Sequence, residues 1–246
     1  MIRRQAMMLS LAAAAPAVAQ DVPSAGVTAS VEVTNDEVRR GLSWSGGRAA
    51  VAGALRGSLG AVDASVRAVT LRDSPRHAGA EAVVDLTAGT GWDLGAIRLD
   101  ASATTHLFAG ARERMDYVEL GATAGYGYGP VYATLGVAVA PSQAAIGGSN
   151  VHLRADANAG IPGTPFTLLA GLGHSSGGVT DPVRAQRLRP GGSYLDWRLG
   201  VEHRRDRLTF GIDYLGSDVA PEDATGRFAD AAHAGDRLVG RAQLSF

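Results

Sequence analysis

The sequence contains neither cysteine nor lysine. Without cysteine, a secreted chain has no disulfides and must be held together by extensive burial or by a closed network of hydrogen bonds. The absence also excludes a lipoprotein anchored through a cysteine that follows an export signal. No Cys/His cluster has the spacing of a zinc site, and we expect neither a metal nor a cofactor. All 23 basic residues are arginine, which we interpret as compositional bias.

A long apolar run is also missing. A membrane-spanning helix needs roughly 20 apolar residues, and no segment reaches that length. The short apolar stretch 9–15 follows Arg3 and Arg4 and precedes the small residues Ala17-Val18-Ala19. This order is typical of a cleaved signal peptide, which we place at residues 1–19.

The charge of the mature chain is nearly balanced. Removing residues 1–19 takes away two arginines and leaves 21 basic against 24 acidic residues, a net charge of −3. Proteins that bind nucleic acid usually present a clearly basic face. We therefore expect no nucleic acid among the partners.

Polar and apolar residues alternate along almost the whole mature chain. At the end of the sequence, Leu238, Gly240, Ala242, Leu244 and Phe246 alternate with residues that are mostly polar or charged. A period of two predicts strands, and no convincing helical period of 3.6 is present. The predicted strands lie near residues 27–34, 48–59, 62–72, 78–89, 96–108, 115–127, 131–140, 149–160, 166–175, 194–204, 207–216 and 236–246.

The connections between these strands alternate in length. Tight turns are predicted at 60–61, 90–95, 129–130, 162–165 and 205–206, whereas 176–193 and 217–235 are long and rich in Gly, Pro, Asp and Ser. Short turns on one side and long loops on the other, with an even strand count, are typical of bacterial outer-membrane barrels. The predicted fold class is all-β: a transmembrane, antiparallel, up-and-down β-barrel of about twelve strands over residues 27–246.

A soluble β-sandwich, such as a periplasmic binding protein, would show the same alternation. Three features favour the membrane barrel: the export signal, the unequal connections, and a last strand that runs to the terminal Phe246. Because hydrocarbon offers no partner for a free backbone N–H group, a sheet in a membrane must close on itself.

Several segments resemble one family. Residues 37–43, with Arg39-Arg40-Gly41, are similar to the "FRGxS" stretch that follows the first strand of the TorF-type porins. Residues 194–201 resemble the "YxDWxxGV" strand of that family, and 208–218 and 236–246 resemble its following and closing strands. The resemblance implies an outer-membrane barrel of the porin kind without a settled substrate. The chain departs from the family in being poor in aromatic residues.

One enzyme motif was weighed. Gly173-His174-Ser175-Ser176-Gly177 fits the G-x-S-x-G pattern, which requires a strand, a sharp turn and then a helix. A loop follows instead, and no upstream oxyanion loop is present. His106, His152 and His174 also have no nucleophile that sequence can place within reach. We interpret the motif as a Gly/Ser-rich loop and expect no enzymatic activity.

The polar phase of the strands predicts which side chains line the barrel lumen. Seven arginines and ten acids belong to this phase: Glu32, Arg56, Asp63, Arg67, Glu81, Asp85, Arg98, Asp100, Glu119, Arg154, Asp156, Asp196, Arg198, Glu202, Asp213, Arg237 and Arg241. Buried alone, each charge would cost several kcal/mol, so these groups must be paired or hydrated. A hydrated lumen would be a narrow hydrophilic pore, and interlocked charges would plug it. An inward fold of loop 176–193 would narrow it further.

The leading hypothesis is a porin-like channel of the cell outer membrane for passive diffusion of small hydrophilic solutes or ions. The alternatives are a closed structural or surface-interaction barrel without conductance, and the soluble sandwich. Outer-membrane lipid and the barrel-assembly machinery are the expected partners, and the sequence leaves the oligomeric state open. Leu244 and Phe246 are the predicted assembly signal.

Overall fold

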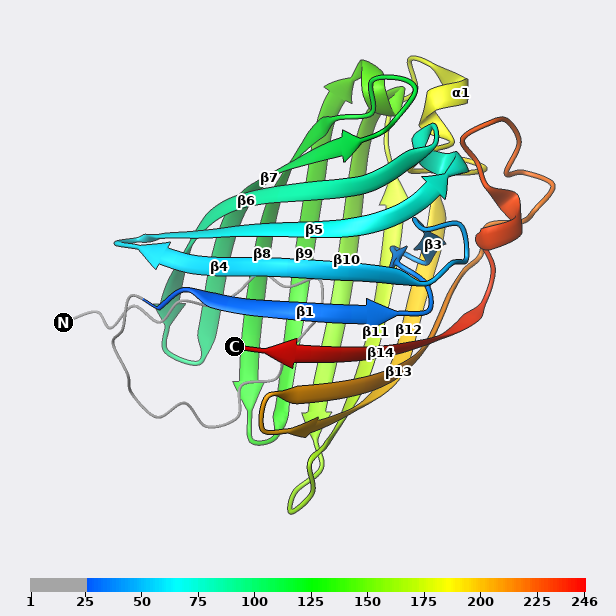
Figure 1. The fold of residues 1–246 in the computed structure, drawn as a ribbon. Coiled ribbons are helices and arrows are strands. Elements are labelled where there is room, and N and C mark those ends of the chain that lie inside the picture. The colour runs from blue at the N-terminus through cyan, green and yellow to red at the C-terminus, as the bar shows by residue number, and fades with distance from the viewer. Residues whose placement is uncertain (1–25) are drawn as a thin grey trace.

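The computed structural model describes residues 26–246 and shows a closed barrel of twelve antiparallel strands. Each strand pairs with its neighbours in the chain, and the first pairs with the last (Figure 1). The strands are β1 (Thr28–Thr34), β4 (Ala50–Leu59), β5 (Val62–Ser74), β6 (Ala80–Leu94), β7 (Ile97–Ala109), β8 (Tyr117–Tyr128), β9 (Val131–Gln143), β10 (Gly148–Gly160), β11 (Phe166–Ser176), β12 (Tyr194–Arg205), β13 (Leu208–Ser217) and β14 (Arg237–Ser245). The predicted fold class is confirmed, and the soluble sandwich is excluded by the closure. The predicted signal peptide lies outside the described residues.

The barrel closes between β1 and β14. Val31 lies opposite Leu244, and Ser30 lies opposite Ser245. Phe246 extends the pairing, because its N–H group donates to the carbonyl oxygen of Ala29 at 2.8 Å. The last residue of the chain is therefore part of the seam, and the ladder is paired on both sides of β1.

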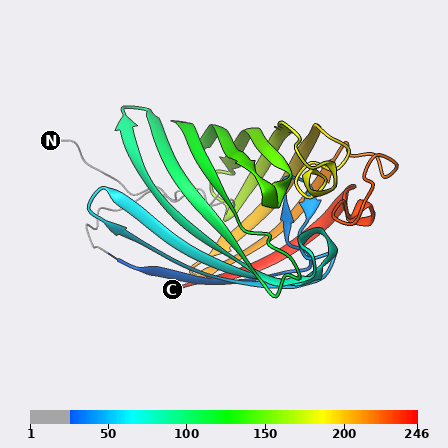
Figure 2. The same cartoon turned by 90° about the horizontal axis from the view of Figure 1, so that it is seen from above.

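The two ends of the barrel differ. At one, the turn end, two-residue turns join the pairs Leu59↔Val62, Tyr128↔Val131 and Arg205↔Leu208. At the other, the loop end, the chain runs through residues 35–49, 75–79, 110–116, 144–147, 177–193 and 218–236. The predicted alternation of short and long connections is thus observed. Figures 1 and 2 show α1 (Pro182–Ala185) at the loop end and the C-terminus at the opposite end.

One predicted turn is shorter than expected. The sequence predicts a turn over residues 90–95, which include Gly91 and Gly95, but residues 90–94 continue β6, where Trp92 pairs with Leu99 and Leu94 with Ile97. Only residues 95–96 form the turn, with Gly95 at a φ of +68°. The ladder to β7 overrides the local preference of glycine for turns, since each added pair satisfies backbone groups on both strands.

The polarity of the barrel is inverted relative to a soluble protein. Large apolar side chains such as Leu135, Leu172 and Leu238 are each 65% exposed on the outer face. Charged side chains such as Glu202 and Asp213 are buried on the inner face. Among residues 26–246, no helix is long and apolar enough to cross a membrane.

A short hairpin that the sequence did not predict lies within the connection from β1 to β4. It consists of β2 (Val38–Arg39) and β3 (Leu42–Ser43), with a turn at Arg40 and Gly41. We call residues 35–49 the inner segment, because their side chains bond to the inward-facing side chains of the barrel wall. Gly41 needs to be glycine: its φ is +71°, and a Cβ atom there would overlap the carbonyl oxygen of Gly216.

Candidate functional site: the barrel interior

The inward-facing side chains of the strands include the residues of the predicted polar phase. On the interior lie Glu32, Arg56, Arg67, Asp85, Arg98, Asp100, Glu119, Arg154, Asp156, Asp196, Arg198, Glu202, Asp213, Arg237 and Arg241. Asp63 is half-buried at the turn end, where its carboxylate accepts from Ser58. Glu81 is the exception: it is exposed near the loop end of β6, beside Gly110.

The inner segment is pinned to the barrel wall by a chain of ion pairs. Arg39 reaches Glu37 at 2.9 Å and Asp85 of β6 at 2.8 Å. Arg67 of β5 contacts Glu37 at 2.8 Å and Glu32 of β1 at 3.3 Å. The network thus joins three strands through two residues of the inner segment.

The electrostatic effect of this network falls on Glu37. Burial by itself would raise its pKa, but the guanidinium groups of Arg67 and Arg39 outweigh burial and lower the pKa to about 2. The same contacts raise the pKa of Arg39, although burial opposes them. Both groups are therefore charged at neutral pH, and the pairing offsets their desolvation.

A second set of contacts holds the tip of the hairpin. Arg40 donates to Glu119 of β8 at 2.7 Å. The ring of His106 on β7 lies between two acids, with Nδ1 2.7 Å from Asp85 and Nε2 3.8 Å from Glu119. The tip is therefore attached to β8, three strands further around the barrel than β5, which carries Arg67.

Further charges lie closer to the turn end. Arg241 contacts Glu202 at 2.7 Å and Asp213 at 3.2 Å, and Arg198 contacts Asp213 at 2.7 Å. On the opposite wall, Arg98 contacts Asp100 at 3.0 Å. The first group links β12, β13 and β14, whereas Arg98 and Asp100 pair within β7, and in both places the charges of opposite sign lie side by side.

The part of the interior that lies closer to the turn end is partly open to solvent. The side chains of Arg154, Asp156 and Arg198 are 24%, 34% and 21% exposed, in contrast to Glu37 at 7%. Arg154 and Asp156 are also loosely paired, at 3.7 Å. The interior is therefore a polar vestibule at the turn end and becomes densely filled toward the loop end.

Small residues make room for these charges. A Cβ atom at Gly136 would meet the side chain of Arg154, and one at Gly171 would meet Asp156. Both glycines belong to the inward phase of their strands. The side chains of Arg154 and Asp156 lie over these glycines of the adjacent strands. This arrangement leaves space along the barrel axis.

The loop end is closed by two apolar clusters. The first includes Trp44 of the inner segment, Leu71, Tyr117 and Leu188. The second combines Leu42 and Tyr194 with Val219 and the alanines of segment 218–236. The predicted inward fold of loop 176–193 is observed: Leu188 is 6% exposed and Arg187 is fully buried.

The inner segment was not predicted from the sequence. A signal for it was present in the charged residues Asp36, Glu37, Arg39 and Arg40, which lie between two predicted strands.

The contact between His152 and Ser175 in the interior does not have the geometry of a catalytic relay. His152 Nδ1 lies 3.0 Å from Ser175 Oγ and 3.7 Å from Asp196 Oδ2. A relay uses one ring nitrogen for the serine and the other for the acid, whereas here both approach the same nitrogen. Ser175 is fully buried on β11, and the strand continues through Ser176 into the loop 177–181 and not directly into a helix. Within residues 26–246, no group of three or more His, Cys, Asp or Glu residues is arranged to hold a metal ion.

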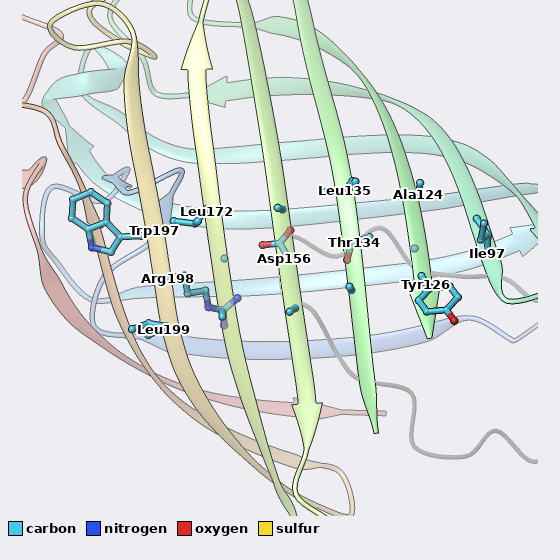
Figure 3. A pocket seen from close by; sticks show the side chains of 16 residues that line it. Ile97, Ala124, Tyr126, Thr134, Leu135, Asp156, Leu172, Trp197, Arg198 and Leu199 are labelled. Atoms are coloured by element: carbon cyan, nitrogen blue, oxygen red, sulfur yellow. The ribbon is translucent and has the colours of Figure 1, made fainter. Parts of the chain in front are cut away.

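The outer wall carries an apolar groove of about 820 Å³ across β7 to β12 (Figure 3). Its sides are formed by outward residues such as Ile97, Leu135, Leu172 and Leu199. Small outward residues, among them Ala124, line the rest. Asp156 and Arg198, whose charged groups belong to the interior, also line the groove, but most of its lining is apolar.

The chain matches the sequence model of one family over residues 19–243, described as "Bacterial protein of unknown function (Gcw_chp)". The chain belongs to this family. A search of curated proteins finds no match. The description of the Gcw_chp family names no activity, so the function has to be inferred from the geometry of the barrel interior.

Solved structures of outer-membrane barrels resemble this Gcw_chp protein at low identity. OmpF of Salmonella typhi is 7% identical, with a TM-score of 0.49, 89% of this chain covered and 96% of the other. LpxR of Salmonella typhimurium is 10% identical, with a TM-score of 0.45 and coverage of 89% and 99%. OprD of Pseudomonas aeruginosa is 13% identical, with a TM-score of 0.43 and coverage of 81% and 60%.

Proposed function

We propose that this protein is a porin-like channel of the outer membrane that lets small hydrophilic solutes or ions diffuse through its charge-lined interior. The observation that carries the proposal is the inverted polarity. An apolar outer face and a charged inner face suit a barrel that stands in hydrocarbon and encloses water. In the conformation described above, the loop end is closed, so conduction requires the inward-folded connections to move.

The arrangement of charges supports passive transport without strong selectivity. Acidic and basic groups alternate around the vestibule, as in the set Arg198, Asp213, Arg241 and Glu202. Facing charges of opposite sign create a field across a pore and favour polar solutes of either sign. No residue has a catalytic role in this proposal, and no cofactor is involved.

The location and the partners are part of the same proposal. Residues 1–19 direct export, the barrel-assembly machinery inserts the chain, and Leu244 with Phe246 forms the assembly signal. Outer-membrane lipid then surrounds the apolar face. The resemblance to the TorF-type porins, carried by residues 37–43 and 194–201, agrees with this assignment.

Single-channel recording in a planar bilayer tests the proposal. We expect brief, discrete conductance steps from the purified full-length protein, and longer openings when residues 179–191 are replaced by a short Gly-Ser linker. Heat-modifiable migration on a gel verifies that both proteins are folded barrels. Folded protein that gives no steps in either form would overturn the channel function.

A closed structural or surface-interaction barrel is the second candidate. The dense ion pairs around Glu37 and the apolar clusters at the loop end favour it. In that case segments 177–193 and 218–236 serve as surface loops. The same recordings discriminate between the two, because a structural barrel stays silent even after the loop is shortened.

A further inference from the structure

Two arginines at the loop end are buried in an unusual way. Arg76, on η1 (Pro75–His77), and Arg187, on segment 177–193, are both fully buried. Within residues 26–246, neither side chain lies within ion-pair distance of a carboxylate, unlike Arg39, Arg40 or Arg241. Their partners are backbone carbonyl oxygens and the ring of His77.

Arg76 joins four connections. Its Nε donates to the carbonyl oxygen of Ser43 at 3.1 Å, in the inner segment. One terminal nitrogen donates to the carbonyl of Arg187 at 3.0 Å, and the other donates to that of Asp230 at 3.4 Å. A single side chain on segment 75–79 thus holds segments 35–49, 177–193 and 218–236.

Arg187 joins the remaining two. One terminal nitrogen donates to the carbonyl oxygens of Met115 at 2.6 Å and Ala145 at 3.1 Å. Its Nε donates to Nδ1 of His77 at 3.0 Å, and the guanidinium lies 4.3 Å from the centre of the Phe108 ring. Together the two arginines therefore bond to all six connections at the loop end.

A buried cation bonded to neutral carbonyls is costly, because Asp230 near Arg76 and Asp116 near Arg187 lie beyond ion-pair distance and offset the desolvation only in part. Burial lowers the pKa of both Arg76 and Arg187 to about 10. Removing either group from the interior would recover its hydration and at the same time release several connections. Besides the two apolar clusters, the closed loop end is thus held by a few hydrogen bonds from two cations that would be better solvated in water.

We propose that Arg76 and Arg187 form a latch that holds the loop end closed, and that release of Arg187 lets segment 177–193 swing out. Arg187 is the moving part, because it lies on the long segment 177–193, whereas Arg76 lies on the five-residue connection 75–79. If the protein is the proposed channel, this latch is its gate. Only the expected effect of the latch on conductance rests on the proposed channel function. Opening itself is measurable without conduction.

Because the chain contains no cysteine, a single introduced thiol reports on opening. Leu188→Cys places a thiol beneath the latch, at a site that is 6% exposed, and Val183→Cys places one on α1, at a site that is 47% exposed. Folded protein in vesicles is treated with a membrane-impermeant thiol reagent. In the parent background we expect slow labelling at position 188 and fast labelling at position 183.

Adding Arg187→Gln should accelerate labelling at position 188 by about tenfold or more and leave position 183 unchanged. The matched control is Arg207→Gln, at an exposed turn of the opposite end, which should change neither rate. If Arg187→Gln does not fold by heat-modifiable migration, Arg187→Lys replaces it: this variant keeps the charge but loses the fork of donors. Unchanged labelling at position 188 in the folded variant would overturn the latch.

Conductance of the same variant separates the two proposals. Faster labelling with longer channel openings supports both. Faster labelling without any conductance leaves the latch standing and overturns the channel function. Conductance in the parent, with labelling and openings unchanged in the variant, retains the channel and rejects the latch.

Discussion

At the scale of single residues, the inner segment depends on one glycine and one carboxylate. Gly41 allows the hairpin to turn within contact of Gly216 and Asp196 of the barrel wall. Glu37 pairs with both Arg39 and Arg67, and without it each of these arginines would have one carboxylate fewer as a partner. Substitutions of Gly41 and Glu37 can therefore be compared with substitutions of Gly46 and Glu81.

Gly41→Ala should destabilise the barrel more than Gly46→Ala. Both glycines have a positive φ, +71° and +62°, so each substitution costs about 1–2 kcal/mol from backbone strain. At Gly46 the nearest atoms are 3.6 Å from a new Cβ, whereas at Gly41 the Cβ overlaps the carbonyl of Gly216. We expect a further loss of about 1–3 kcal/mol for Gly41→Ala in the free energy of unfolding by urea in vesicles. Equal losses for the two variants would contradict the close approach.

Glu37→Gln should cost on the order of 3 kcal/mol in the same measurement, because it leaves Arg39 and Arg67 with incomplete compensation. The pKa of Glu37 is lowered to about 2, so its contribution is fully present above the unfolded value of 4.5 and is lost as the pH falls through about 2. Exposed Glu81 provides the control, and Glu81→Gln should change stability by less than about 0.5 kcal/mol. A small loss for Glu37→Gln that does not differ from the control would count against the network.

At the scale of elements, the loop-end connections form one body that contains a fully buried histidine, His77. Burial lowers its pKa well below the usual range, and the cations Arg187, Arg76 and Arg39 lower it further, as does His106. The ring also lies against Trp44 and Phe108, at 4.4 Å and 4.7 Å between ring centres. His77 is therefore neutral in the closed arrangement, as the hydrogen bond from Arg187 to its Nδ1 requires.

Acid should open the loop end. The closed arrangement keeps His77 unprotonated, whereas an open one lets it bind a proton near the usual pKa of about 6.5. The closed arrangement therefore keeps its full stability above that pH and loses up to about tenfold in population per pH unit below it. The labelling rate at Leu188→Cys, divided by that at Val183→Cys, should rise between pH 7.5 and 5.5. His77→Gln should remove the rise, and a rise that persists in that variant would assign the effect to another group.

At the scale of the whole molecule, the closed hydrogen-bonded ring explains how a chain without disulfides holds together. Every barrel strand is paired on both sides, including β1 with β14. Because an open edge cannot be satisfied in hydrocarbon, closure by Phe246 and its neighbours is the step on which the proposed membrane location depends.

Phe246→Ala should reduce the yield of assembled barrel more than Phe166→Ala does. Both residues are exposed aromatics at strand ends, 61% and 42% exposed, and each substitution removes a similar apolar area. The backbone bonds between Phe246 and Ala29 remain in the variant. A larger loss at position 246, measured as heat-modifiable protein in outer membranes, would therefore reflect recognition during assembly. Equal yields would remove Phe246 from the assembly signal.

The sequence by itself determined the number and order of the barrel strands, which face of each is polar and that the ends of the barrel differ. These properties are local: the alternation of Leu238 to Phe246 or the turn at 129–130 can be read within a few residues. The tertiary structure alone decided that the loop end is closed. Arg76 meets the carbonyl of Arg187 across 111 positions and that of Asp230 across 154. Every residue carries a carbonyl oxygen, so no side-chain pattern marks these acceptors, and only the folded chain brings them to the two arginines.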